Sequence, residues 1–165
     1  MGSGKSYVGQ HLAQNINADF IDLDDLIVEN NGQSIPEIFQ QHGENYFRVS
    51  ESACLKSLKN AKNTVIALGG GTPCFFDNME WINENGVSIY LKTNPNVLVE
   101  RLKNETNQRP LIQQLEEAEL LSFIQNKVAE RSVFYEKAHL EYAVETGKET
   151  IVEDLTKFLR RMTNL

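Results

Sequence analysis

The chain has 165 residues, of which 41% are hydrophobic and 24% are charged, a composition suited to one globular domain with a core of its own. Its formal net charge of −7 argues against a general nucleic-acid binder, because such proteins neutralise phosphates with many Lys and Arg side chains. No apolar run is long enough to span a membrane and the N-terminus lacks signal-peptide features, so we expect a cytoplasmic protein without membrane or nucleic-acid partners.

A phosphate-loop pattern, MGSGKS, opens the chain. The full signature reads G-x-x-x-x-G-K-[ST], and only its last part is present, with Lys5 and Ser6 at the lysine and Mg²⁺-ligand positions. Val8, Leu12 and Ile16 then recur at helical spacing, which predicts a helix from Lys5 to about Ile16. Backbone amides of such a loop and the positive end of its helix bind phosphate. The stretch therefore predicts a nucleotide-binding loop. The alternative is a glycine turn that binds no ligand.

Three carboxylates lie at the carboxyl end of the next predicted strand, residues 18–22 (ADFID), where a helical piece over residues 23–29 begins. The carboxyl ends of strands are where open α/β sheets bind ligands, so Asp22, Asp24 and Asp25 are candidate site residues. Alternatively, Asp24 or Asp25 only caps the following helix. Asp22 and Asp24 need not share a face of the chain.

The rest of the chain alternates between helix and strand. Ser34-Ile35-Pro36-Glu37 has the form of a capping box and begins a helix that stops near Gly43. The further predicted elements are helix 44–61, strand 64–68, helix 78–85, strand 87–91, helix 95–103, loop 104–114, helix 115–133, strand 141–144 and helix 150–162. This alternation predicts an α/β fold with a parallel sheet and helices on both faces.

Glycines and arginines supply the remaining candidates. Gly69, Gly70 and Gly71 directly follow a buried strand, where backbone can approach a ligand closely, although a flexible connection is the alternative. Three separated arginines, at positions 48, 109 and 131, suit recognition of carboxylate or phosphate by planar guanidinium groups. Arg48 could instead be a solvated helix residue, and the third arginine could pair with a neighbouring glutamate. Arg109 precedes a proline, which favours an extended lid strap.

Six motifs in order cover almost the whole chain: GSGKS at 2–6, FIDLD at 20–24, GENYFR at 43–48, ALGGG at 67–71, RPLI at 109–112 and ERSVFY at 130–135. In this order the sequence resembles the shikimate kinase family. The resemblance implies one P-loop kinase domain over residues 1–165, built as a three-layer α/β/α fold with sheet order 2-3-1-4-5. It also implies substrate-binding helices over about 31–61 and a mobile lid over about 104–116.

The resemblance further implies a role for each matching residue. The ATP phosphates would contact Gly2, Ser3, Gly4, Lys5, Ser6 and Arg109, and Mg²⁺ would be held by Ser6 and, through water, by Asp22. Shikimate would contact Asp24, Arg48, Gly70, Gly71 and Arg131. Lys5, Asp24 and Arg109 would be catalytic, with Asp24 the candidate acceptor of the reacting proton. For adenine, the candidates are Arg101 and Lys148.

The expected function is phosphorylation of the 3-hydroxyl of shikimate with ATP and Mg²⁺, within the chorismate pathway to aromatic amino acids, by a monomeric enzyme. One alternative is a gluconate or nucleoside monophosphate kinase of similar architecture. Another is an inactive, truncated nucleotide-binding relic. The lysine, carboxylates and arginines of the motifs are all present, which argues against an inactive relic.

In the family's sheet order the first strand is central, and no strand precedes the phosphate loop in this sequence. Each unpaired buried backbone group costs about 1–3 kcal/mol, so several would rival the 5–15 kcal/mol that typically separates folded from unfolded states. We therefore expect the natural chain to begin upstream with a strand ending in Gly. By itself, the 165-residue chain is expected to be weakly stable and little active.

Overall fold

The computed structural model describes residues 2–103, 117–144 and 148–163. Helices and strands alternate along these residues, which confirms the predicted α/β class. The bounds are α1 Lys5–Ile16, β1 Asp19–Asp22, α2 Leu23–Asn31, α3 Ile35–Ser57, β2 Thr64–Ala67, α4 Asn78–Asn85, β3 Ile89–Thr93, α5 Pro95–Lys103, α6 Glu117–Tyr135, β4 Leu140–Val144 and α7 Lys148–Thr163. Two short 3-10 turns, Leu58–Asn60 and Thr72–Cys74, are additional to the predicted elements.

The strands form two parallel pairs. β1 pairs with β2 from Asp19↔Thr64 to Asp22↔Ala67, and β3 pairs with β4 from Ile89↔Leu140 to Thr93↔Val144. In the predicted order 2-3-1-4-5, β1 and β2 correspond to the neighbouring strands 2 and 3, and β3 and β4 correspond to the neighbouring strands 4 and 5. The two pairs are therefore the outer pairs of the predicted sheet. In the part of the chain that the structure describes, no strand joins the two pairs.

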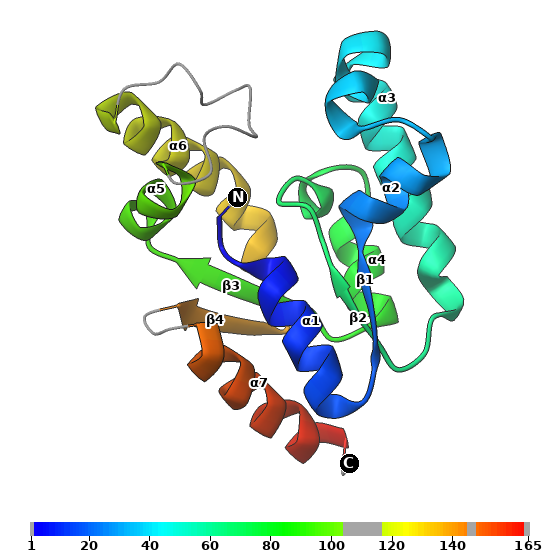
Figure 1. Ribbon diagram of the computed structural model, residues 1–165, viewed down its shortest axis with the longest axis vertical. Helices are drawn as coiled ribbons and strands as arrows, with labels where there is room; N and C mark the ends of the chain where they lie inside the picture. Colours follow the sequence, from blue (N-terminus) through cyan, green and yellow to red (C-terminus); the bar gives the residue numbers. More distant parts are fainter. Residues whose placement is uncertain (1, 104–116, 145–147, 164–165) are drawn as a thin grey trace.

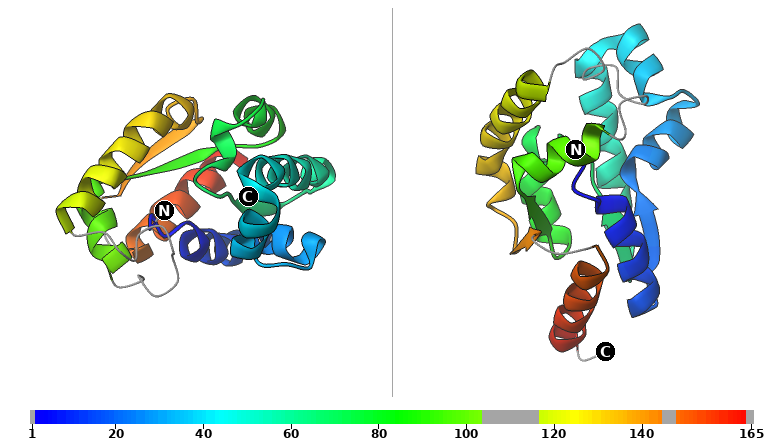
Figure 2. Two further views of the ribbon diagram at one scale, coloured as in Figure 1. Left: turned by 90° about the horizontal axis from the view of Figure 1, so that it is seen from above. Right: turned by 60° about the vertical axis from the view of Figure 1, so that its left-hand side comes forward.

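Helices lie on both sides of the strands, as the left view of Figure 2 shows, with α1 on one side and α4 and α6 on the other. α1 lies between the two pairs in Figure 1 and packs against β1, β2 and α7. The apolar side of α1 packs with α7 and β4 in one hydrophobic cluster. A second hydrophobic cluster is formed by α2 with α3, and a third by α5 with α6. The buried members of the first cluster are Val8, Leu12, Val144, Ile151, Val152 and Leu155. Contacts between α1 and α7 therefore help to hold the two strand pairs together.

Local signals in the sequence explain the helix that carries the candidate Arg48. α3 begins with the predicted capping box, in which the Ser34 amide donates to Glu37 Oε2 at 2.8 Å. Inside α3, Gly43 has φ 77° and ψ 176°, a conformation that a glycine adopts with little strain. The predicted break at Gly43 is confirmed as a kink, after which the helix continues to Ser57. The kink sets the direction of the turn of helix that presents Arg48.

The third strand starts later than predicted. The sequence favoured residues 87–91, but β3 is Ile89–Thr93. Val87 is 51% exposed, and the Ser88 amide donates to His139 Nδ1 at 3.2 Å, so side-chain contacts precede the ladder. Pairing begins at Ile89 and extends to Thr93, because β4 offers partners as far as Val144. An apolar pattern alone does not give this register.

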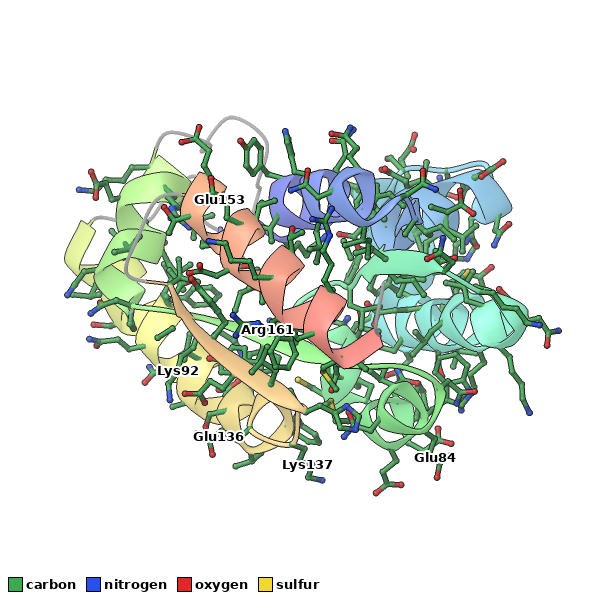
Figure 3. All side chains as sticks on the ribbon, turned by 90° about the horizontal axis from the view of Figure 1, so that it is seen from below. Glu84, Lys92, Glu136, Lys137, Glu153 and Arg161 are labelled. Atoms are coloured by element: carbon green, nitrogen blue, oxygen red, sulfur yellow. The ribbon has the colours of Figure 1, made fainter. Side chains whose placement is uncertain are left out.

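Many charged side chains lie at the rim of the molecule. In Figure 3, Glu84, Lys92, Glu136 and Lys137 project outward from its edge. Lys92 forms an exposed ion pair with Glu141 at 2.9 Å. None of the helices in the described ranges combines the length and apolar character needed to cross a bilayer.

Candidate active site

The phosphate loop leads directly into the N-terminus of α1. Gly2 and Gly4 have φ of 68° and 87°, the left-handed region that favours glycine. Arg101 of α5 donates through Nη1 to the carbonyl oxygens of Gly2 at 3.2 Å and Ser3 at 3.3 Å. Arg101, a sequence candidate for contact with adenine, thus contacts the loop itself. Its bonds hold the loop in a conformation that leads the chain straight into the positive end of a helix.

The loop residues meet the carboxylates at the end of β1. Lys5 Nζ lies 3.2 Å from Asp22 Oδ2 and 3.4 Å from Asp24 Oδ2. Ser6 donates its hydroxyl to Asp22 Oδ2 at 2.6 Å, and the Asp22 side chain is only 8% exposed. Asp22 also caps α2 by accepting from the Asp24 amide at 3.1 Å. The sequence left open whether Asp22 and Asp24 face the same way, and the structure brings both to Lys5.

These oxygens suit a divalent cation. Mg²⁺ prefers oxygen ligands and is usually held by one or two carboxylates together with substrate phosphates. The Ser6 hydroxyl and the Asp22 carboxylate supply two such oxygens beside the N-terminus of α1. Among the described residues no cluster of three or more acidic, His or Cys side chains is arranged for a metal. The oxygens of Ser6 and Asp22 beside the N-terminus of α1 fit a cation that is shared with phosphate.

Arg48 occupies a fixed position on α3. Its Nη1 donates to Glu51 Oε2 at 2.9 Å, and its Nε and Nη2 both donate to Glu44 Oε1, at 3.2 and 3.0 Å. The guanidinium also lies 4.3 Å from the centroid of the Phe75 ring, a cation–π contact. With 11% of its side chain exposed, Arg48 is not the solvated helix residue that the sequence allowed.

The glycine loop lies against these groups. A Cβ added to Gly71 would lie 2.5 Å from Arg48 Nη1, and one added to Gly69 would lie 3.1 Å from Asp24 Oδ1. The loop therefore approaches both candidates closely: a side chain at position 71 would collide with Arg48, and one at position 69 would crowd Asp24. This geometry supports the site interpretation of Gly69–Gly71 over a flexible connection. It also brings Asp24 and Arg48, from different elements, to the same loop.

A buried network that the sequence analysis missed supports the loop. Glu51 is 1% exposed, and its Oε1 accepts from Thr72 Oγ1 at 2.6 Å while its other oxygen accepts from Arg48. Asn78 Nδ2 donates to the Thr72 carbonyl at 2.9 Å, and Ser52 Oγ donates to Asn78 Oδ1 at 2.7 Å. The available signal was the spacing of Glu51 three residues after Arg48, which puts both on one helix face.

Arg131 is carried by α6, which contacts the 3-10 turn Thr72–Cys74 after the glycine loop. Burial raises the pKa of the Cys74 thiol, although the nearby charges of Arg131 and Arg48 lower it. Two arginines far apart in sequence thus lie near Cys74, in the turn after the loop. Glu130, one proposed alternative partner of Arg131, instead pairs with Lys127 at 2.7 Å.

Tyr135 joins α6 to the glycine loop. Its hydroxyl donates to the Gly70 carbonyl oxygen. Burial raises the pKa of Tyr135, although Arg131 lowers it, and the protonated phenol is the form that can donate this bond. Sequence reasoning quoted Tyr135 in a motif without giving it a role.

One predicted site residue and one predicted segment lie outside the described residues: Arg109 and the lid over about 104–116. The side chain of Lys148 lies outside them as well. The other predicted residues form two groups. The first lies at the loop before α1 and consists of Gly2, Ser3, Gly4, Lys5, Ser6 and Asp22. The second lies around the glycine loop and consists of Arg48, Gly70, Gly71 and Arg131. Asp24 pairs with Lys5 of the first group and approaches Gly69 of the glycine loop.

Comparisons with known proteins point to one family. A family model described as shikimate kinase matches residues 1–163. A shikimate kinase of Bacteroides fragilis is 37% identical over 166 residues, covering 100% of this chain and 93% of that protein. One of Bacteroides thetaiotaomicron is 41% identical over 138 residues, covering 84% of this chain and 79% of that protein.

Solved structures agree. The crystal structure of the Bacteroides thetaiotaomicron shikimate kinase has a TM-score of 0.89 and 36% identity, covering 100% of this chain and 94% of that chain. The Acinetobacter baumannii shikimate kinase in complex with shikimate has a TM-score of 0.84 and 32% identity, covering 99% of this chain and 89% of that chain.

Proposed function

The chain belongs to the shikimate kinase family, and we propose that its two groups of residues hold ATP with Mg²⁺ and shikimate for phosphoryl transfer. The reaction is the ATP-dependent phosphorylation of the 3-hydroxyl of shikimate. Mg²⁺ as the cofactor and the role of each residue are part of the proposal. The cytoplasmic location and the monomeric state stay predictions.

The observation that carries the proposal is the position of Asp24. Its carboxylate lies 3.4 Å from the phosphate-loop Lys5, and it is 3.1 Å from where a Cβ on Gly69 would be. A group placed between a phosphate site and a carboxylate-binding site can orient a hydroxyl toward the phosphate. Proximity and orientation of this kind, together with charge stabilisation, account for most of the catalysis of phosphoryl transfer.

The proposed binding site for the ATP phosphates is inferred from the charged groups around Lys5. The amides at the start of α1 and the Lys5 ammonium attract the phosphates, while Ser6 and Asp22 would hold Mg²⁺. The metal, when bound, neutralises charge on the phosphate oxygens. The Ser6 hydroxyl and the Asp22 carboxylate lie 2.6 Å apart, so both would be close to one cation.

The proposed shikimate-binding site is built around two arginines. Arg48 is held by Glu44 through Nε and Nη2 and by Glu51 through Nη1, and it is stacked on Phe75, so its orientation is fixed before substrate binds. Arg131 is carried by α6, which contacts the turn after the glycine loop, and two guanidinium groups suit one carboxylate. The backbone of Gly70 and Gly71 then lies within reach of the ring hydroxyls. This clamp favours a compact hydroxy acid over a nucleoside monophosphate.

In the proposed reaction the 3-hydroxyl oxygen of shikimate attacks the γ-phosphorus of ATP. The new phosphorus–oxygen bond forms as the bond from the γ-phosphorus to the β,γ-bridging oxygen breaks, and ADP leaves with that electron pair. Asp24 accepts the hydroxyl proton and passes it to water. Lys5 lies where it can stabilise charge on the transferred group.

Replacing Arg131 with alanine is expected to raise the KM for shikimate about 10- to 100-fold, because a charge-assisted contact to the substrate carboxylate is lost. The KM for ATP should change less than about 2-fold, since the phosphate loop is untouched. Both constants are measured by ADP release. An equal rise in both would contradict the carboxylate clamp.

The function itself is tested by offering shikimate, gluconate and AMP in parallel and measuring ADP release. We expect turnover with shikimate and none above background with the other two. Turnover with AMP or gluconate alone would assign the site to the alternative kinases. If shikimate binds in a calorimeter but no acceptor is phosphorylated, the chain is the inactive relic.

A further inference from the structure

The glycine loop has no side chains that could fix its conformation. A glycine adopts a wider range of φ and ψ than other residues, so each peptide unit of the loop needs hydrogen bonds to stay in one orientation. The Gly69 carbonyl accepts from the Thr72 amide at 3.1 Å. The Gly71 carbonyl accepts from the Cys74 amide at 2.9 Å. Within the described residues no backbone amide bonds the Gly70 carbonyl, so the neighbouring backbone leaves the orientation of its peptide open.

A side chain from a distant part of the sequence holds this carbonyl. The Tyr135 hydroxyl, on α6, donates to the Gly70 oxygen although 65 positions separate the two residues. The Cys74 thiol also contacts this oxygen, at 3.9 Å, but a thiol is a weak donor. The orientation of the peptide between Gly70 and Gly71 therefore depends mainly on Tyr135.

The same peptide carries the Gly71 amide. The described residues contain no cis peptide bond, and in a trans peptide the N–H and the carbonyl point in opposite directions. A Gly70 carbonyl held by Tyr135 thus directs the Gly71 N–H away from the phenol. Gly71 is buried, and within the described part of the chain its N–H donates to no backbone carbonyl. A buried amide of this kind is available to an acceptor on a bound ligand.

Tyr135 also contacts one of the two arginines. Arg131 precedes it by about one helical turn and forms a side-chain hydrogen bond with it. A guanidinium only donates, so the phenol oxygen accepts from Arg131 while its proton goes to Gly70. Burial is the largest influence on the pKa of Tyr135 and raises it, so the phenol keeps this proton. At the next residue, a Cβ on Gly71 would lie 2.5 Å from Arg48 Nη1. The loop and Tyr135 therefore connect the two arginines.

We propose that Tyr135 is a positioning residue for shikimate, whose hydroxyl holds the Gly70–Gly71 peptide in one orientation and ties Arg131 to it. Tyr135 acts through the Gly71 amide and the Arg131 guanidinium, and it fixes their positions before the substrate binds. Such preorganisation raises affinity, because less freedom is lost on binding. The inference rests on the proposed function for the identity of the ligand. The orientation of the peptide is a property of the free protein and can be measured without substrate.

The first test is Tyr135→Phe, which keeps the ring and its contact with Tyr90 at 4.9 Å between centroids but removes the hydroxyl. We expect the Kd for shikimate, from calorimetry, and its KM to rise about 10-fold, as for the loss of one hydrogen bond. The KM for ATP should change less than about 2-fold, since the phosphate loop is untouched. A purely structural role would instead lower the thermal midpoint and raise both KM values together.

Tyr90→Phe is the matched control. Tyr90 lies in ring contact with Tyr135, and burial raises its pKa as well, but among the described residues no hydrogen bond acts on its hydroxyl. This variant should bind shikimate as the parent does. If Tyr90→Phe weakens shikimate binding as much as Tyr135→Phe, packing of the two rings explains the effect and the proposal is overturned.

The second test observes the loop in the free protein by NMR. The sequence contains only two Gly–Gly peptides, 69–70 and 70–71, so protein labelled at glycine with ¹³C carbonyl and ¹⁵N gives two carbonyl–nitrogen correlations. We expect Tyr135→Phe to shift or broaden the correlation of peptide 70–71, and Tyr90→Phe to leave both in place. Unchanged correlations in Tyr135→Phe would overturn the proposal, as would a shifted correlation with unchanged shikimate affinity.

A double-mutant cycle tests the tie to Arg131. In the Arg131→Ala background, Tyr135→Phe should raise the Kd for shikimate less than about 3-fold, because residues that act together have effects that do not add. A full 10-fold rise in this background would contradict the coupling. If the parent chain does not bind shikimate at all, the proposed function is wrong, whereas the two NMR correlations still decide whether Tyr135 holds the loop.

Discussion

Replacing Lys5 with methionine is expected to lower kcat for shikimate phosphorylation about 1,000-fold. Methionine keeps most of the length of the side chain but removes the charge that lies within 3.4 Å of both Asp22 and Asp24. Loss of one preorganised charged donor at a phosphoryl-transfer site costs about 10²- to 10³-fold or more. The KM for shikimate should change only a few-fold, because the contacts of Arg48 are intact. ADP release gives both constants.

A lysine on the surface provides the matched control. Lys92 pairs with Glu141 at 2.9 Å, but both side chains are about half exposed, and such pairs contribute little to stability. The Lys92→Met variant should therefore keep the parental kcat. Both variants are assayed in the 165-residue chain. A fall of less than 10-fold for Lys5→Met would exclude Lys5 from charge stabilisation.

The part of the site that the sequence predicted well is the part with local signatures. Lys5 and Ser6 follow from the phosphate-loop pattern, and the structure places them beside Asp22 as expected from a strand that ends next to the loop. Glu51 and Thr72 follow from no local signature. Their bond joins two segments that are 21 residues apart, and only the packing of α3 against the loop brings them together.

Whether a segment forms a helix or a strand could be predicted from the sequence, but the register of the strand pairing could not. The capping box at Ser34 and the break at Gly43 are encoded in a few adjacent residues, and both are confirmed. The start of β3 depends on which residues of β4 lie opposite, so Val87 was assigned to the strand although it is half exposed.

Replacing Gly71 with alanine is expected to raise the KM for shikimate about 10- to 100-fold with little loss of stability. The backbone at Gly71 has φ −91° and ψ −24°, which alanine adopts without strain. The new methyl group, however, would lie 2.5 Å from Arg48 Nη1. Arg48 cannot move away freely, because Glu44 and Glu51 hold its guanidinium and Phe75 stacks on it. The collision therefore disturbs the proposed carboxylate clamp itself.

Gly86→Ala provides the matched control. No atom lies within 4 Å of a Cβ at Gly86, and its φ of −173° is ordinary extended backbone. The thermal midpoints of both variants should therefore stay within about 3 °C of the parent. Only Gly71→Ala should lose shikimate affinity, measured by calorimetry as well as by KM. If Gly71→Ala binds shikimate as tightly as Gly86→Ala, Arg48 adjusts without cost and its fixed orientation is not what binds the carboxylate.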